Sequence, residues 1–246
     1  MLSNKSIISM SMHKAGSTIA DSILVDILEA KGMQIDRIAL LVSGSPLPER
    51  EVFINYQDQM SLTGVYYGIA RGPYVSEMPI IDKMKIVVQV RDPRDCLTSA
   101  YFSFKTSHRL PQDPAKRDAF LERRKMLEGL DIDAYVLSQT GGYKNRLKIL
   151  KDIVESHDDA LMLKYEDMVE HTETWLAQLS DFVGQPITPD LRAKLGNKID
   201  FSVTSEDAGR HKRQVTPGDH RRKLATETIT EMSRRLSPEM IWFGYQ

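Results

Sequence analysis

The apolar segment Ile86–Val90, with the sequence IVVQV, constrains the fold of this chain more than any other feature. Continuous β-branched runs of this kind are typical of strands that are buried on both faces of a parallel sheet. Asp92 and Pro93 follow at once and favour a helix N-cap with proline at the first helical position, so a helix is expected over about 93–105. Because parallel strands need long crossover connections, usually helices, the chain is expected to be an α/β protein.

The N-terminal segment shows the same order of strand, turn and helix. The apolar run Ile7–Met12 is followed by turn-like residues 13–18 and then by a helical pattern that ends near Gly32. This order is that of the opening unit of an α/β nucleotide-binding fold.

Further elements are expected downstream, although residues 33–80 are harder to interpret. There, Ile38–Val42 is a candidate strand, and the Ser, Gly and Pro residues of 43–50 predict a loop. No repeat or linker divides the chain, so residues 1–246 are expected to form one three-layer domain, with a central parallel sheet and helices on both faces. The other expected elements are a strand over Ala160–Lys164 and helices over 114–128, 131–156 with an interruption at Gly141–Gly142, 172–183 and 224–236.

The composition excludes several classes of protein. The 246 residues carry 33 Lys and Arg against 34 Asp and Glu, a net charge of −1, which argues against a dedicated nucleic-acid binder. Cys96 is the only cysteine, so an intramolecular disulfide and a zinc site built on several cysteines are excluded, and a reducing compartment is expected. No apolar run approaches the roughly 18 residues of a membrane span, and Ile7–Met12 is too short for a signal peptide. We therefore expect a soluble cytoplasmic protein without a membrane partner.

The turn after the first strand, residues 11–19 (SMHKAGSTI), has the composition of an anion-binding site. Backbone N–H groups and the helix dipole converge on an anion at such a turn. Gly16 lets the backbone approach the anion, and Lys14 adds a positive charge. Ser17 and Thr18 add hydroxyl donors. This is not a Walker A loop, because the lysine precedes the glycine, and an ordinary polar turn is the alternative interpretation.

A second candidate site lies after the strand Ile86–Val90. Arg91 leaves the sheet at a carboxyl end, where open α/β sheets bind ligands, and Ser99 lies two helical turns further on. An arginine and a helix hydroxyl placed in this way can bind a second phosphate. In the alternative interpretation Arg91 and its charged neighbours only cap the helix and pair with one another, as we expect for Arg94 and Asp95.

A basic segment near the C-terminus, residues 209–223, carries six Lys or Arg against Asp219 alone, a local net charge of +5. Such a loop in a neutral protein predicts an anionic ligand, and Arg213 can bind phosphate with two parallel donors. A solvated basic surface is the alternative, which we expect to hold for residues 221–223. A nucleic-acid site is disfavoured, because no aromatic residues are interleaved with the basic ones.

Four segments, in this order, resemble motifs of the sulfotransferases that use 3′-phosphoadenosine 5′-phosphosulfate (PAPS). HKAGST (13–18) resembles their 5′-phosphosulfate loop. RDPRDCLTSAYF (91–102) resembles their 3′-phosphate motif, with its arginine and serine eight residues apart. LKYEDM (163–168) resembles their YED segment, and RQVTPGDHRR (213–222) resembles their RKGxxGDW segment.

The resemblance implies a fold similar to the P-loop kinases and transfer of a sulfuryl group from PAPS to a hydroxyl or amine of a small-molecule acceptor, with PAP as the second product. No metal ion is implied. In this reading Lys14 is catalytic, because it neutralises charge on the leaving phosphate oxygen. The implied nucleotide-binding residues are Lys14, Ala15, Gly16, Ser17 and Thr18 for the 5′-phosphosulfate, Arg91, Ser99 and Arg213 for the 3′-phosphate, and Tyr165 for the adenosine.

The chain departs from the family pattern in four places. The aromatic residue expected after the phosphosulfate loop is Ile19, so Phe201 becomes the candidate that stacks on adenine, and the tryptophan of the GDW segment is His220. The family's KTH segment, which carries the catalytic histidine, corresponds to residues 66–75 (YYGIARGPYV), which contain no histidine. Arg71 cannot replace it, because arginine stays protonated. The family's C-terminal dimer motif is absent, so the oligomeric state stays open.

The general base must therefore come from elsewhere. His108 follows the 3′-phosphate helix, in a region that lines the acceptor pocket of related enzymes, and an ordinary histidine pKa of about 6.5 suits proton transfer at neutral pH. A surface histidine is the alternative interpretation. Glu49, Glu51 and Asp58 lie near the position of a glutamate base in the carbohydrate sulfotransferases, and His13 is expected to orient the turn.

The acceptor itself is not identified by the sequence. Residues 33–80 and 105–140 are expected to form its pocket, with an aromatic wall as one possibility. Two other functions stay open: a nucleotide-dependent kinase of the same fold, which would need Mg²⁺ and a GK[ST] loop that the sequence lacks, and a non-catalytic binder of phosphorylated nucleotide. The candidate wall consists of Tyr66, Tyr67, Tyr74, Tyr101, Phe102 and Phe104.

Overall fold

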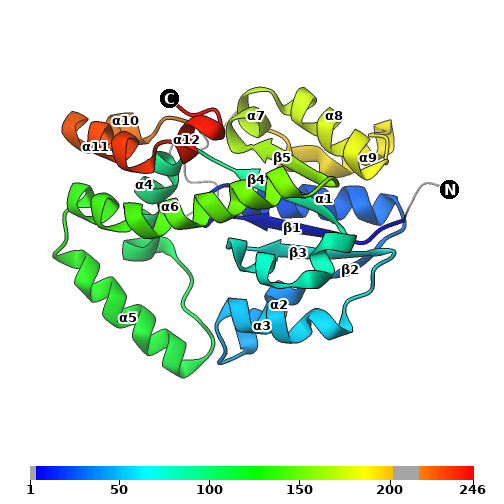
Figure 1. Cartoon of the computed structure of the whole chain (residues 1–246), viewed down its shortest axis with the longest axis horizontal. Coiled ribbons are helices and arrows are strands. Elements are labelled where there is room, and N and C mark those ends of the chain that lie inside the picture. The colour runs from blue at the N-terminus through cyan, green and yellow to red at the C-terminus, as the bar shows by residue number, and fades with distance from the viewer. Residues whose placement is uncertain (1–3, 202–215) are drawn as a thin grey trace.

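Five parallel strands form the sheet around which the chain is built (Figure 1). The computed structural model describes residues 4–201 and 216–246. The spatial order of the strands is β2-β3-β1-β4-β5, and each neighbouring pair is parallel, which confirms the expected α/β fold. The strands are β1 (Ile7–Ser11), β2 (Gln34–Asp36), β3 (Val65–Ala70), β4 (Lys85–Val90) and β5 (Ala160–Lys164).

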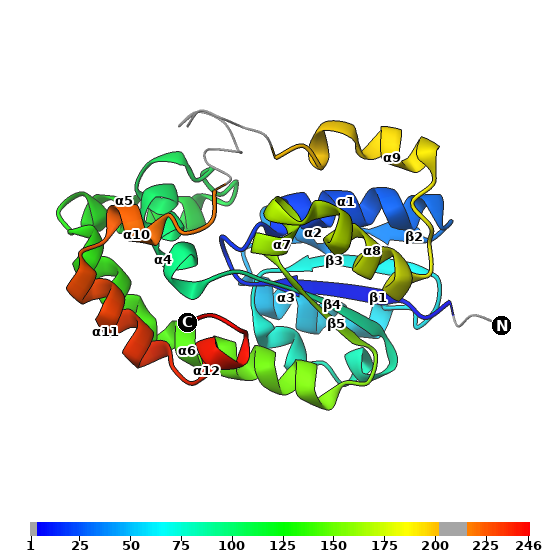
Figure 2. The same ribbon diagram turned by 90° about the horizontal axis from the view of Figure 1, so that it is seen from above.

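Helices cover both faces of the sheet, as a second view shows (Figure 2). One face carries α1 (Ser17–Ala30), α7 (Tyr165–Glu170), α8 (Thr172–Val183) and α9 (Pro189–Leu195). The core on the other face receives α2 (Ile38–Gly44), α3 (Glu49–Tyr56), α4 (Pro93–Phe102), α6 (Ile132–Ser156), α11 (Thr226–Leu236) and α12 (Glu239–Trp242). The remaining helices are α5 (Pro114–Glu128), which extends away from the sheet in Figure 1, and the short α10 (His220–Lys223). Short 3₁₀ turns cover Gln57–Gln59, Pro73–Glu77, Pro79–Lys83 and Gly196–Lys198, and a π-helical turn covers Ser103–Ser107.

The neighbouring inner strands β1 and β4 contribute to both cores. Successive side chains of a strand point to opposite faces of the sheet. Ile8 and Met10 of β1, with Val88 of β4, therefore pack into the core beneath α6, whereas Ile7 and Val87 pack into the core beneath α1. Burial on both faces explains why these two strands appear in the sequence as continuous apolar runs.

The strand order creates a ligand-binding position at the carboxyl ends of β1 and β4. From β1 the chain continues to β2 and β3 on one side of the sheet, and then to β4 and β5 on the other. In open α/β sheets, ligands bind at such a switch in strand order. Ser11, at the end of β1, pairs with Gln89 of β4, so the turn after β1 and Arg91 leave the same edge of the sheet.

The expected strand at Ile38–Val42 is wrong, because these residues belong to helix α2. Ile38 is fully buried and Val42, four residues later, packs beside it, whereas Leu40 and Leu41 are 68% and 49% exposed. One buried stripe at a spacing of four residues is a helical pattern. In so short an apolar run, this pattern is difficult to distinguish from a strand.

Two further elements differ from expectation. Strand β3, which has no counterpart among the expected elements, is buried along all six residues. Helix α6 continues through Gly141 and Gly142 without the expected interruption. Each glycine costs about 1 kcal/mol in a helix interior, but Tyr143 and Leu147 bury their side chains in the core and hold the helix in place.

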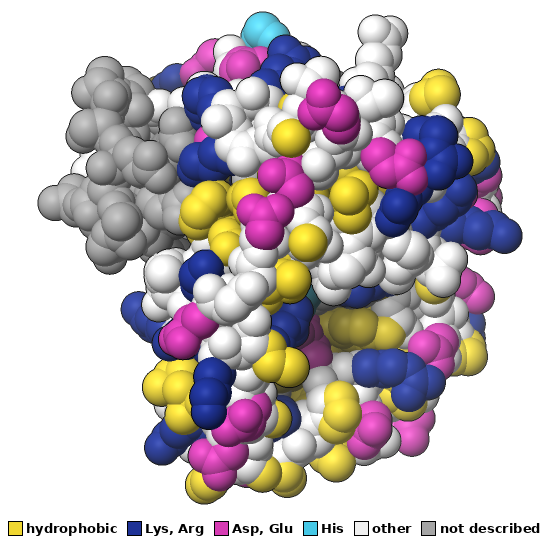
Figure 3. Space-filling model, turned by 90° about the vertical axis from the view of Figure 1, so that its left-hand side faces the viewer, with side chains coloured by type: hydrophobic (Ala, Val, Ile, Leu, Met, Phe, Trp, Pro, Cys, Tyr) yellow, Lys and Arg dark blue, Asp and Glu magenta, His cyan; other side chains and the backbone are white. Residues whose placement is uncertain are grey.

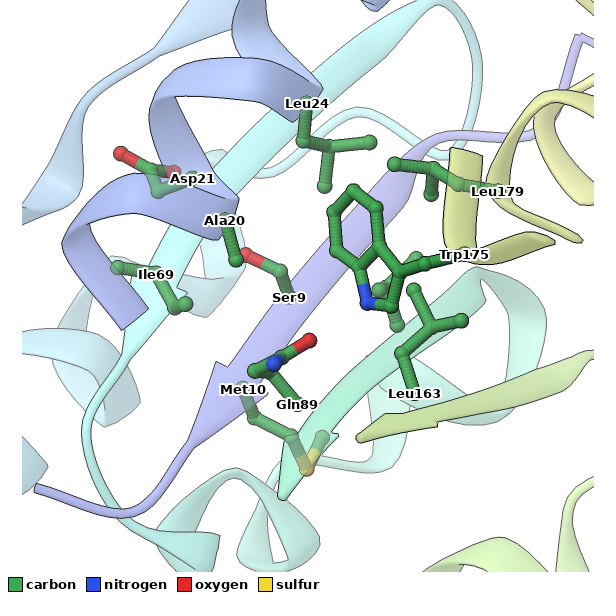
Figure 4. A pocket seen from close by; sticks show the side chains of 11 residues that line it. Ser9, Met10, Ala20, Asp21, Leu24, Ile69, Gln89, Leu163, Trp175 and Leu179 are labelled. Atoms are coloured by element: carbon green, nitrogen blue, oxygen red, sulfur yellow. The ribbon is translucent and has the colours of Figure 1, made fainter. Parts of the chain in front are cut away.

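A small cavity of about 10 Å³ lies between the sheet and helices α1 and α8 (Figure 4). Gln89 of β4 and Trp175 of α8 line it, together with Ser9 and Asp21. The amide nitrogen and oxygen of Gln89 and the indole nitrogen of Trp175 are buried and have no hydrogen-bond partner within residues 4–201 and 216–246. An unpaired buried polar group costs on the order of 1–3 kcal/mol.

We expect Gln89→Met to raise the free energy of unfolding by about 1 kcal/mol, because it removes an unpaired buried amide and keeps the side-chain length. Denaturant unfolding of the variant and the wild type measures the difference. A lower free energy of unfolding in the variant would mean that the Gln89 amide is satisfied by a polar partner inside the cavity.

Candidate active site

The turn between β1 and α1 presents unpaired backbone donors. Gly16 caps α1 in the left-handed conformation, with φ of 77°, and its carbonyl accepts hydrogen bonds from the N–H groups of Ile19 and Ala20. In the part of the chain that the structure describes, the N–H groups of Gly16, Ser17 and Thr18 donate to no acceptor. Free donors at the positive end of a helix dipole form an anion-binding site.

Gly16 is required here for two reasons. Its positive φ disfavours any residue with a side chain. In addition, a Cβ atom at this position would lie 2.5 Å from Cδ2 of Tyr165, which follows β5. The turn after β1 therefore packs directly on the segment after β5, and the absence of a side chain at Gly16 allows that approach.

Lys14 is held in the turn at its side chain and its backbone. It is the only non-glycine residue with positive φ, 71°, in the described part of the chain. Its Nζ donates to Oγ of Ser103 at 3.1 Å, and its carbonyl accepts from Nη1 of Arg91 at 3.2 Å. Ser103 lies four residues after Ser99, about one turn further along the same helical path. No local pattern in the sequence indicates the contact between Lys14 and Ser103, which only the tertiary fold brings together.

Arg91 is almost completely buried, with 8% of the residue exposed. Its guanidinium carbon lies 4.3 Å from the centre of the Tyr165 ring, and Nη2 lies 3.4 Å from Oδ2 of Asp95. Its Nε is buried and has no partner among residues 4–201 and 216–246. The alternative interpretation is thus partly correct, because Arg91 does pair with Asp95, but a donor of its guanidinium is still available to a ligand.

Asp95 attaches the C-terminal segment to α4. Its carboxylate accepts hydrogen bonds from the backbone N–H groups of Gly218 and His220 and from Nδ1 of His220, at 2.7, 2.9 and 2.7 Å. Burial alone would raise the pKa of Asp95, but the hydrogen bonds from His220 and the charge of Arg91 hold that pKa well below its usual range. Position 220, where the family has tryptophan, thus serves here as a buried polar anchor. Arg94 pairs with Asp92, as expected of a capping residue.

The other candidate nucleotide-binding residues differ in how far they are buried and in what they contact. Ser99 is half-buried on α4, and Tyr165 is buried beneath Arg91 and beside Gly16. Phe201 is half-buried beside the core under α1. Arg213 lies outside the described residues.

Glu166 is a positioning residue that the sequence analysis did not assign. Its carboxylate accepts from the backbone N–H of Asp92 at 2.9 Å and from the hydroxyl of Tyr245 at 2.9 Å. It thereby joins the end of β4 to the segment after β5 and to the C-terminus. Burial raises the pKa of Glu166, and these hydrogen bonds oppose the increase.

His108 lies between aromatic rings beside the turn. Its ring stacks on Phe120 at 5.2 Å between centroids and lies 5.3 Å from the ring of Phe104, although the residue as a whole is exposed. Packing against these rings, with the charges of Lys14, His13 and Arg124, lowers the pKa of His108 to about 4. The imidazole is therefore neutral at pH 7 and can accept a proton.

His13 shares this environment. It is half-buried, and its ring meets Phe104 edge-on at 6.5 Å. Burial and the positive charges of Arg71, Arg146, Lys14 and Arg123 lower the pKa of His13 to about 4. Both histidines next to Lys14 are thus neutral at neutral pH.

Of the three carboxylate candidates, only Glu49 is attached to the active-site edge of the sheet. Its Oε1 accepts from the backbone N–H of Arg71, directly after β3, at 2.9 Å and from the hydroxyl of Tyr74 at 2.6 Å. Glu51 and Asp58 are exposed and form no hydrogen bond with the residues of this edge. Glu49 directly follows the loop residues 43–48, and nothing in this part of the sequence indicates the contacts of Glu49 with Arg71 and Tyr74.

The described residues contain neither a metal-binding cluster nor a membrane-spanning helix. No cluster of three or more His, Cys, Asp or Glu residues within them has the arrangement of a metal site. In the same residues, no helix has the length and apolar character needed to cross a membrane.

Comparisons with solved structures identify similar folds. A mouse sulfotransferase complexed with PAP matches with a TM-score of 0.61 and 17% identity, over 96% of this chain and 85% of the mouse chain. A retinol dehydratase complexed with retinol and PAP matches with a TM-score of 0.58 and 16% identity, over 98% of this chain and 82% of the other. The same enzyme with androsterone and PAP matches with a TM-score of 0.55 and 15% identity. No curated protein sequence matches this chain.

A family model also matches the chain directly. The model of the sulfotransferase domain covers residues 75–241, about two thirds of the sequence. The matched segment contains β4 with Arg91, the whole of α4 and the Tyr165 segment, all of which meet at the edge of the sheet described above. By this match, and in keeping with its fold, the chain belongs to the sulfotransferase domain family.

Proposed function

We propose that this protein transfers a sulfuryl group from PAPS to a hydroxyl or amine of a small-molecule acceptor. The observation that carries the proposal is the junction of two anion-binding elements at the switch in strand order. There, Arg91 donates to the carbonyl of Lys14, so the phosphosulfate turn and the 3′-phosphate strand end are in direct contact. The structural relatives named above hold PAP, which agrees with PAPS as donor.

The residues of this edge fit a bisphosphorylated nucleotide. The turn offers the free N–H groups of Gly16, Ser17 and Thr18, and Gly16 has no side chain to obstruct a ligand. Arg91 offers a buried Nε that has no partner among the described residues, and Ser99 offers a hydroxyl on α4, about two turns beyond the strand end. Arg213 remains the proposed second ligand of the 3′-phosphate. Tyr165 remains the proposed contact of the adenosine, and Phe201 the proposed residue that stacks on adenine.

The chain's own groups would act mainly by position and charge. PAPS supplies an activated sulfuryl group whose transfer leaves charge on a phosphate oxygen. Lys14 would stabilise that charge, and because Ser103 and Arg91 hold its side chain and carbonyl, it is already positioned. The N–H groups of the turn would hold the 5′-phosphate, and acceptor and donor would be aligned by the rigid sheet edge.

His108 is the proposed general base. Its neutral imidazole lies in the aromatic cluster beside Lys14, and it can accept a proton from the acceptor directly or through one water. Glu49 is the alternative base, since its carboxylate is attached at Arg71, the position that corresponds to the missing histidine segment.

Other proposals concern the wider role of the protein. One domain spanning residues 1–246, a cytoplasmic location and an acceptor that is a small molecule rather than a nucleic acid remain our predictions. Retinol and androsterone, bound in the structures of retinol dehydratase, are examples of acceptor-sized molecules. A PAPS turnover screen across acceptor classes, read by mass spectrometry, tests the function. Binding of PAP without turnover would instead support a non-catalytic nucleotide binder.

Lys14→Ala is expected to lower kcat by roughly 10²–10³-fold, the cost of losing one donor to the transition-state charge. The measurement is turnover at saturating PAPS, with Lys148→Ala, an exposed lysine on α6, as the matched control. Turnover near the wild-type value in Lys14→Ala would remove Lys14 from the mechanism.

Arg91→Ala and Arg213→Ala are each expected to weaken PAP binding by about 2–5 kcal/mol, because each leaves the 3′-phosphate with an unpaired charge. Calorimetry should compare PAP with adenosine 5′-phosphate, which lacks the 3′-phosphate. Arg91→Lys keeps the charge but not the paired donors, and it controls for loss of the fold. Equal weakening of both ligands would contradict the 3′-phosphate assignment.

His108→Ala and His108→Asn are expected to lower kcat by roughly 10²–10⁴-fold while PAP affinity is unchanged. The lowered pKa sets the pH dependence: the neutral, proton-accepting form predominates above about pH 4, so wild-type activity should fall only as pH drops through about 4. That acidic limb should disappear in both variants. If both turn over normally and Glu49→Gln does not, the base is the Glu49 carboxylate.

A further inference from the structure

Three arginines surround His13 on the β3 side of the sheet. Ala70, the last residue of β3, pairs with Met10 of β1, so Arg71 leaves the sheet beside the turn that carries His13. The guanidinium carbon of Arg123, on α5, lies 4.4 Å from the centre of the Phe104 ring, which itself meets the ring of His13. Arg146, on α6, is the third, and all three charges contribute to the lowered pKa of His13.

These arginines lack anionic partners. No Asp or Glu of residues 4–201 and 216–246 forms an ion pair with Arg71, Arg123 or Arg146. By contrast, the surface residues Arg50, Arg192 and Arg234 each form an ion pair with a glutamate.

Two carboxylates lie near Arg71, and neither accepts from its guanidinium. Glu49 accepts from the backbone N–H of Arg71 and from Tyr74. Asp21 accepts from the hydroxyl of Tyr66 at 2.6 Å, and the charge of Arg71 opposes the increase that burial causes in the pKa of Asp21. A cluster of guanidinium groups that outnumbers the neighbouring carboxylates and forms no ion pair with them attracts an anionic ligand.

The strand order separates this cluster from the nucleotide-binding groups. In the order β3-β1-β4-β5, Arg91 and Tyr165 follow β4 and β5, on one side of the turn after β1. Arg71 follows β3, on the opposite side of that turn. Because Lys14 lies between the two sides, where the sulfuryl group would be transferred, the β3 side is the side of the acceptor.

The surroundings of the cluster are aromatic. Phe104 and Phe120 pack edge-on at 6.2 Å, and Tyr135 extends the same wall towards α6, where its ring lies 5.5 Å from that of Tyr101. On the face that Figure 3 presents, the surface is hollowed below the grey atoms, and hydrophobic, basic, acidic and histidine side chains meet within the hollow. The site thus combines an apolar wall with guanidinium groups that form no ion pair within the described residues.

We propose that the acceptor is itself an anion: a hydroxyl compound whose carboxylate or similar group pairs with Arg71 and Arg123 while its apolar body packs on the Phe104–Phe120 wall. The inference rests on the proposed function, because it names the substrate class of that same site. Guanidinium groups bind carboxylates with two parallel hydrogen bonds, which gives both affinity and orientation to the acceptor.

The test uses the whole protein saturated with PAP, so that the nucleotide site is occupied. Two matched pairs serve as probes: 4-hydroxybenzoate with 4-hydroxybenzamide, and 3-(4-hydroxyphenyl)propanoate with its amide. Within each pair, the two compounds differ only in the charge and hydrogen bonding of the carboxylate or amide group. Binding is measured by thermal shift and calorimetry, and turnover is measured with PAPS in place of PAP. We expect at least one carboxylate to bind about tenfold more tightly than its amide, the effect of one charge-assisted contact.

The variants Arg71→Gln and Arg123→Gln should each remove most of this preference. Lys125→Gln, which loses the same charge on the same helix as Arg123 without an assigned contact, is the matched control and should retain it. Equal binding of carboxylates and amides by the wild type would overturn the inference. So would a loss of PAP affinity in Arg71→Gln and Arg123→Gln, because the arginines would then serve the donor. Failure of the proposed function is distinguishable, since the wild type would then turn over none of the probes with PAPS, whereas the preference for carboxylates is measured by binding alone.

Discussion

The buried guanidinium of Arg91 is the group on which the rest of the site depends. It lies on the ring of Tyr165 after β5, donates to the carbonyl of Lys14 after β1, and pairs with Asp95 on α4. Asp95 in turn holds the backbone of the segment around His220. Four parts of the chain that are distant in sequence therefore meet around one cation. A buried charge is costly unless it is paired and hydrogen-bonded, so the arrangement of these segments is fixed by the need to satisfy it.

The arrangement also holds the turn after β1 in one conformation before any ligand arrives. Lys14 adopts a left-handed backbone conformation, which is unfavourable for a residue with a side chain. The hydrogen bonds from Arg91 to its carbonyl and from its Nζ to Ser103 oppose that cost. Strained backbone that is fixed by its surroundings is typical of functional sites, where it reduces the reorganisation needed at the moment of reaction.

The sequence predicts those parts of the molecule that depend on local pattern. Strands β1, β4 and β5 are short apolar runs, and the motifs at Lys14 and Arg91 follow two of them. By contrast, α2 has an apolar run too short to show its period, and β3 combines Gly68 with two tyrosines in a pattern that resembles neither element. The site contacts of Ser103, Glu166 and His220 are also absent from any local pattern, because each joins segments that only the tertiary fold brings together.

Arg71 lies in the segment that corresponds to the family's histidine segment, and its charge bears on both the base and the proposed acceptor. An arginine at this position cannot accept a proton. Burial lowers the pKa of the nearby histidine His13, and the charges of Arg71, Arg146, Lys14 and Arg123 lower it further. A histidine whose pKa is lowered in this way is neutral at pH 7 but is a weak base. In the proposed reaction, the same positive charges would also favour the oxyanion that forms as an acceptor hydroxyl loses its proton, so they would lower the pKa of that hydroxyl. A weak base would be sufficient for an acceptor hydroxyl that its surroundings make more acidic. The lower basicity of the histidine and the lower pKa of the hydroxyl would therefore offset one another.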